Sequence, residues 1–107
     1  MTTTEPIRRA CAKATGYPEE RIFSKERTIP LPWIRACAVH LARKHGFKWA
    51  AIADELNLGN HSSAVAAEMR FLARFGAKSY EIDTELYRRI ENVLKQKKNG
   101  LFSNEGV

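Results

Sequence analysis

Hydrogen-bonding side chains gather in one short stretch of the chain, Asn60-His61-Ser62-Ser63, directly after Gly59. Helical spacing of apolar residues precedes this stretch over 47–56 and follows it to about Phe75, so the polar residues open a second helix. A helix, a tight turn and a second helix with a polar start are typical of a helix-turn-helix. The start of that second helix enters the DNA major groove. The sequence therefore predicts recognition of double-stranded DNA.

The chemistry of each side chain suggests its contact. Asparagine can bond adenine through two groups, serine can donate or accept at several bases, and a methyl group such as that of Ala66 can contact thymine. Helix capping is the alternative, because Asn60 or Ser62 can accept N–H groups at a helix start. We expect base contacts from Asn60, His61, Ser62, Ser63 and Ala66, and leave capping open, above all for Asn60.

Charge and composition favour a polyanionic partner. The chain has 107 residues, of which 44% are hydrophobic, and a formal net charge of +6. This length suits one domain with one modest core, and the positive charge favours phosphate binding through counterion release. Neither an apolar run of about eighteen residues nor a signal-peptide pattern is found. We therefore expect a soluble, cytoplasmic, nucleoid-associated protein with no membrane contact.

Catalytic and metal-binding patterns are lacking. Cys11 and Cys37 fall on apolar helical faces among alanines, which predicts buried, reduced thiols. A zinc site would need Cys37, His40 and His45, whose spacing does not keep all three on one helix face. No acid pair, Ser-His-Asp set or Gly-x-x-x-x-Gly-Lys-[Ser/Thr] loop can be assembled. We expect no metal, no cofactor and no enzymatic activity.

Helical spacing continues along the chain, and no segment favours a strand. The predicted fold class is all-α, a compact bundle of about five to six helices containing a helix-turn-helix. One domain at 7–97 is expected between a flexible start at 1–6 and a flexible tail at 98–107. The predicted elements are a helix from Ile7 to the stop at Gly16, a helical turn at 17–21, a proline-containing loop at 24–32, helices at 33–44, 47–56 and 61–75, and a last helix that begins near Ile82 and ends before Asn99-Gly100.

Together these segments resemble, from residue 7 to about residue 96, the C-terminal DNA-binding domain of the bacterial replication initiator DnaA. The matching parts occur in the family's order: Ser24-Lys25-Glu26-Arg27, the arginine-containing helix at 33–44, Ile52-Ala53-Asp54, Asn60-His61-Ser62-Ser63 and Tyr80-Glu81-Ile82. The resemblance implies a Trp-repressor-like helix-turn-helix that binds asymmetric origin boxes, with base contacts from residues 60–63.

The chain also departs from this family. The family signature is Gly-Gly-Arg-Asp-His-[Ser/Thr]-[Ser/Thr]-Val, and here Asn57-Leu58-Gly59-Asn60 replaces its first four residues, and Ala64 its valine. We therefore expect DNA binding with a different preferred sequence. Glu26 interrupts the basic run of the loop, and Ile29, Pro30 and Trp33 replace positions that are often polar or basic. Because the nucleotide loop is lacking, a stand-alone domain without the ATPase domain is expected.

Five cations are candidates for the DNA backbone or the minor groove. The resemblance implies Lys25 and Arg27 in the basic loop, and Arg35 near the start of the next helix. Lys48 precedes the turn, and Arg70 lies two turns beyond Ser63 on the same side, so both are placed to contact phosphates. Each of these residues could instead be a solvated surface charge.

Two functions remain open at this point. The favoured one is a sequence-specific DNA-binding regulator of transcription or replication, of a kind that suits bacteria, plasmids or phages. The alternative is a protein-interaction module or initiator antagonist on a helix-turn-helix scaffold, with DNA binding weak or lost and a protein docked near Trp33. Whether a second copy pairs with the chain is open too, because a palindromic site would require a dimer.

Overall fold

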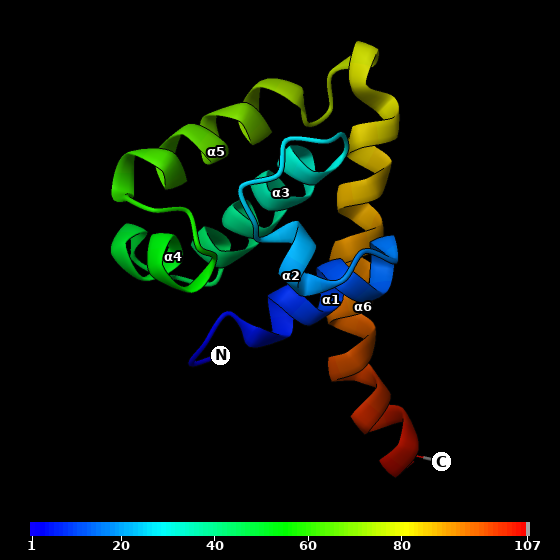
Figure 1. Cartoon of the computed structure of the whole chain (residues 1–107). Helices are drawn as coiled ribbons and strands as arrows, with labels where there is room; N and C mark the ends of the chain where they lie inside the picture. Colours follow the sequence, from blue (N-terminus) through cyan, green and yellow to red (C-terminus); the bar gives the residue numbers. More distant parts are fainter. Residues whose placement is uncertain (107) are drawn as a thin grey trace.

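The computed structural model describes the backbone of residues 1–106 and the side chains of residues 1–96, and within this part it is helical without strands. This confirms the predicted all-α fold. The elements are α1 (Glu5–Thr15), α2 (Glu19–Ile22), α3 (Leu31–Lys44), α4 (Trp49–Glu55), α5 (His61–Arg74), the short 3-10 helix η1 (Lys78–Tyr80) and α6 (Glu81–Gly106) (Figure 1).

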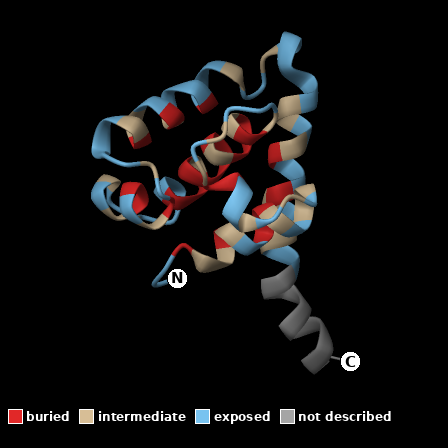
Figure 2. Ribbon diagram, viewed as in Figure 1, coloured by how far each residue is buried: buried red, intermediate tan, exposed pale blue. Residues whose placement is uncertain are grey.

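Helix α3 is the central element. It packs between α5 and α4 on one side and α1 and α6 on the other (Figure 1). Buried positions follow one another along almost its whole length, as Figure 2 shows. Many of them are small, including Ala36, Ala38 and Ala42, so neighbouring helices can approach α3 closely. Cys11 of α1 and Cys37 of α3 lie in this core as free thiols, and burial raises the pKa of both.

An aromatic cluster fixes α5 against α3 and α6. The ring of Phe71 stacks on His40 at 3.9 Å and on Trp33 at 5.4 Å between centroids, and meets Tyr87 edge-on at 4.7 Å. Trp33 is only 3% exposed, and its indole N–H donates to the carbonyl of Asp83 at 2.8 Å. The sequence favours a core position for Trp33 and leaves an exposed partner contact as the alternative; the structure buries Trp33, because the first turn of α3 faces the core.

The chain ends differ from the prediction. Thr4 is buried, and its N–H and hydroxyl both donate to Oε1 of Glu55, at 2.7 and 2.8 Å. Thr4 is thus held against the end of α4, and residues 5 and 6 begin α1, whereas the sequence-based boundary places a flexible start up to residue 6. At the other end the backbone stays helical through Asn99-Gly100, since glycine inside a helix costs only about 1 kcal/mol. The predicted flexible tail at 98–107 lies outside the residues whose side chains are described.

Proline also shifts one boundary. The sequence places the start of α3 at Trp33, after two prolines, but the helix begins at Leu31. Pro32 then occupies the first turn, where its missing N–H would have no helical partner in any case. Among the described residues, no helix combines the length and the apolar character that crossing a membrane requires.

Candidate nucleic-acid interface

A five-residue turn at 56–60 connects α4 to α5. Asn57 and Gly59 adopt left-handed backbone conformations, with φ of 56° and 90°. Glycine adopts this conformation without strain, and asparagine tolerates it better than most residues do. The turn reverses the chain so that α5 starts beside α4, and the two helices pack on each other. The predicted order of helix, turn and helix is therefore present.

Asn60 caps the start of α5. Its side-chain Oδ1 accepts the backbone N–H of Ser63 at 2.9 Å, and its backbone is extended, as at a helix N-cap. The capping role that the sequence left open is therefore real. The oxygen of Asn60 is used inside the protein, which leaves its NH₂ group as the part that could contact a base.

The other predicted base-contact residues lie on the outer side of α5. His61, Ser62 and Ala66 are exposed, and Ser63 is half-buried. The imidazole of His61 stacks on Trp49 of α4, with 6.2 Å between centroids and 19° between planes. The Arg43 guanidinium lies 4.3 Å from the centroid of the same indole. Trp49 thus orients His61 at the outer edge of the turn.

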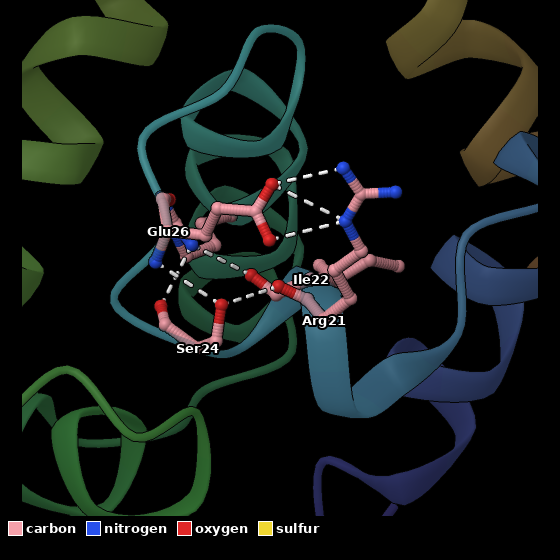
Figure 3. Close-up of polar contacts among 5 residues, drawn as sticks. Arg21, Ile22, Ser24 and Glu26 are labelled. Atoms are coloured by element: carbon pink, nitrogen blue, oxygen red, sulfur yellow. Dashed lines mark hydrogen bonds and ion pairs between the residues drawn. The ribbon is translucent and has the colours of Figure 1, made fainter.

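Arg35 holds the loop between α2 and α3. Its guanidinium donates to the carbonyls of Ile22 at 2.9 Å, Ser24 at 2.7 Å and Glu26 (Figure 3). Burial and the nearby Arg70 lower the pKa of this guanidinium. The sequence predicts a phosphate contact for Arg35. In the structure the N–H groups of its guanidinium are already donated to loop carbonyls, which have no partner within a helix. We therefore assign Arg35 to positioning the loop.

An ion pair braces the same loop on its outer side. Two nitrogens of Arg21 donate to the carboxylate of Glu26, from Nε to Oε1 at 3.1 Å and from a terminal nitrogen to Oε2 at 2.9 Å (Figure 3). This hydrogen bonding lowers the pKa of Glu26. The residue that interrupts the basic run is thereby paired within the protein, and its charge is compensated.

The loop is also tied to the turn. The Lys25 ammonium donates to the carbonyl of Asn57 at 3.0 Å, and the Asn57 side chain donates to the carbonyl of Phe23 at 2.8 Å. A Cβ at Gly59 would lie 3.5 Å from the Lys25 nitrogen. Asn57 is a structural determinant that the sequence analysis missed, although asparagine just past a helix end is a known signal for a left-handed residue.

A groove of about 450 Å³ separates the loop from α5. Six of the residues predicted to contact DNA line it: Lys25, Arg27, Arg35, Ser63, Ala66 and Arg70. The loop cations and the outer side of α5 therefore face one space, although Lys25 and Ser63 are 38 positions apart in the sequence. His61 and Ser62 border a second hollow of about 340 Å³ on the outside of α5, together with Ala66. Lys48 is exposed at the start of α4 and lines neither hollow.

Several cations around α5 have no acidic partner among the described residues. No ion pair within the described part of the chain engages Arg27, Lys48 or Arg70. Two acids of the loop and of α5 are paired inside the protein, Glu26 with Arg21 and Glu68 with His40 at 3.0 Å. The surface is therefore suited to an anionic partner.

Residues 1–96 bring together no group of three histidine, cysteine or acidic side chains that could hold a metal ion. Comparison with protein-family models, with curated proteins and with solved structures gives no match for this chain. A functional assignment therefore depends on the geometry of α5, the loop and the groove between them.

Proposed function

We propose that the protein binds double-stranded DNA sequence-specifically, as a regulator of transcription or replication, and contacts the major groove with the first turns of α5. The observation that carries this proposal is the groove in which Lys25, Arg27 and Arg70 lie beside Ser63 and Ala66. Cations in such a position fix a protein on the phosphates, while neighbouring polar side chains distinguish bases. The unpaired positive charge around α5 is a second support.

The orientation of α5 suits this task. Its buried face, formed by Ala64, Ala67 and Phe71, packs on α3, so the opposite face is free to enter a groove about 12 Å wide. The helix starts at an exposed, capped end, and the partial positive charge of that end favours phosphate. We assign His61, Ser62 and Ser63 to base edges, and Arg27, Lys48 and Arg70 to the backbone.

The resemblance to the DNA-binding domain of DnaA stays a prediction. If it holds, the target is an asymmetric site bound by one copy. The altered turn, Asn57-Leu58-Gly59-Asn60, then changes the preferred sequence, because the arginine and aspartate of the family signature are absent from it. Arg27 is the loop cation best placed for the minor groove or a phosphate, since Lys25 already bonds the turn.

One observation favours the alternative, a protein-interaction module. A second groove, of about 640 Å³, lies between the end of the α2–α3 loop and the start of α6. Ile29 and Ile82 border it with 86% and 85% of their surfaces exposed. A protein partner would dock there, beside the first turn of α3. Arg70 borders both grooves, so the two surfaces adjoin.

Selection of bound duplexes from a random library, at low and at physiological salt, tests the proposal. A motif that persists at physiological salt is the expected result. The double variant His61→Ala/Ser63→Ala should lose sequence preference, at about 1–3 kcal/mol per base contact, with an unchanged helical circular dichroism spectrum.

A matched double variant, Ile29→Ala/Ile82→Ala, should bind DNA as the wild type does. Binding that shows no motif and vanishes as salt rises would overturn sequence-specific recognition. DNA affinity that His61→Ala/Ser63→Ala leaves unchanged would do the same and would direct attention to the Ile29–Ile82 groove.

A further inference from the structure

The solvent-facing side of α5 is polar in its first turn and apolar after it. Ser62, Ala66, Met69 and Ala73 form a stripe at helical spacing and are all exposed. Leu72 lies next to this stripe and is 62% exposed, and Met69 is 65% exposed. Beyond Ser62, the stripe therefore offers neither a hydrogen-bond donor nor an acceptor. We call Ala66, Met69 and Ala73 the apolar ridge.

The surroundings of the apolar ridge identify what covers it. Arg27 and Arg70 lie on its loop side, and Arg43 lies on the Trp49 side, beyond His61. An apolar strip with Arg27 and Arg70 along one side and Arg43 near its His61 end suits a major groove, whose floor of base edges is bordered by phosphate backbones. The ridge also continues directly from His61 and Ser62, which share a hollow of about 340 Å³ with Ala66 and Met69.

The apolar side chains of the ridge determine which base it can contact favourably. Most groups on the major-groove floor are hydrogen-bond donors or acceptors, and an alanine or methionine side chain that covers one leaves it unpaired. The C5-methyl group of thymine is the apolar exception. Methionine suits this contact, because its flexible thioether side chain adapts to small apolar partners.

We propose that the apolar ridge recognises thymine C5-methyl groups, so that the target site carries thymine next to the bases that His61 and Ser62 contact. This inference rests on the proposed function and adds the class of base that the middle of α5 selects. Met69 is then a specificity-determining residue, and Ala66 leaves the space that a methyl group fills.

Replacing thymine by deoxyuridine tests this directly, because only the methyl group is removed. The duplex that the wild-type protein selects is synthesised with deoxyuridine at one thymine at a time, and the dissociation constants are measured. One or two positions should weaken binding about fourfold each, the effect of one buried carbon group. Met69→Ala should bind the thymine and deoxyuridine duplexes equally at one of these positions. Ile82→Ala, which alters an even more exposed apolar residue on α6, should keep the wild-type preference.

The outcomes separate this inference from the proposed function. Sequence-specific binding by the wild type with no deoxyuridine effect at any position would overturn the methyl contact and leave the proposed function standing. A self-association that Met69→Ala abolishes, measured by sedimentation without DNA, would show that a second copy covers the ridge and would also overturn it. If no duplex is selected at all, both proposals fail.

Discussion

Replacing Arg35 with lysine keeps the positive charge but removes the planar fork that bonds three carbonyls of the α2–α3 loop. A lysine ammonium at the end of a single stem can reach one of these acceptors at a time. The variant therefore leaves about two carbonyls to water or unpaired. This perturbation separates a loop-holding role from a phosphate contact, because a phosphate contact depends mainly on charge.

The magnitude follows from the number of bonds and from their exposure. Each lost hydrogen bond contributes about 1 kcal/mol net, and because Arg35 is half-buried, water replaces part of each bond. We expect Arg35→Lys to lower the free energy of unfolding by about 2 kcal/mol. For a domain of this size, that loss lowers Tm by about 10 °C.

Thermal and urea unfolding measure this change, with Arg27→Lys as the control. Arg27 is exposed on the same loop, so its replacement should alter stability by less than about 0.5 kcal/mol. The reasoning is refuted if Arg35→Lys melts within about 2 °C of the wild type, a shift that corresponds to less than about 0.5 kcal/mol. In that case the guanidinium is free to contact phosphate, as the sequence alone suggests.

Three further predictions concern the cap, the acid dependence and the backbone contacts. Asn60→Ala should lower the free energy of unfolding by about 1 kcal/mol in urea titrations, whereas Asn60→Ser should keep most of it; equal losses would argue against the cap. Hydrogen bonds from the N–H and hydroxyl of Thr4 lower the pKa of Glu55, so its carboxylate stabilises the fold at neutral pH and loses this effect as pH falls through the lowered pKa. At pH 7 the wild type should therefore have a higher Tm than Glu55→Gln, and this difference in Tm should disappear well below about pH 4. A Tm difference that does not vary with pH would contradict this. Arg27→Gln should reduce the slope of log K against log salt by about 0.9, while Arg89→Gln on α6 removes the same charge and should leave the slope unchanged; equal effects would show that only net charge matters.

The fold was predictable from the sequence because its signals are local. The spacing of Ala64, Ala67, Phe71 and Phe75 predicts the buried face of α5; the first three residues are buried in the structure, whereas Phe75, just past the end of the helix, is 36% exposed. Glycines at 16, 46, 59 and 76 lie close to helix ends, and each has a positive φ. Such patterns depend on neighbours within one or two turns, so a single sequence is enough to find them.

The contacts that assemble the candidate site were not predictable in this way. Arg35, Asn57 and Thr4 bond groups that lie 9 to 51 residues away, and for Arg35 and for the amide of Asn57 the partner is a backbone carbonyl. A backbone carbonyl is the same at every position, so no residue type marks it as a partner. His40 shows the same limit, since the sequence suggests only a weak metal ligand and the structure stacks its ring on Phe71.

The two tryptophans give the molecule separate optical reporters. Trp33 is enclosed in the aromatic cluster, so its emission follows the integrity of the core. Trp49 is half-buried beside His61, so its emission follows whatever touches the start of α5. A Trp33→Phe variant therefore leaves one fluorophore at the candidate interface, and titrating it follows occupancy of that surface without an added label.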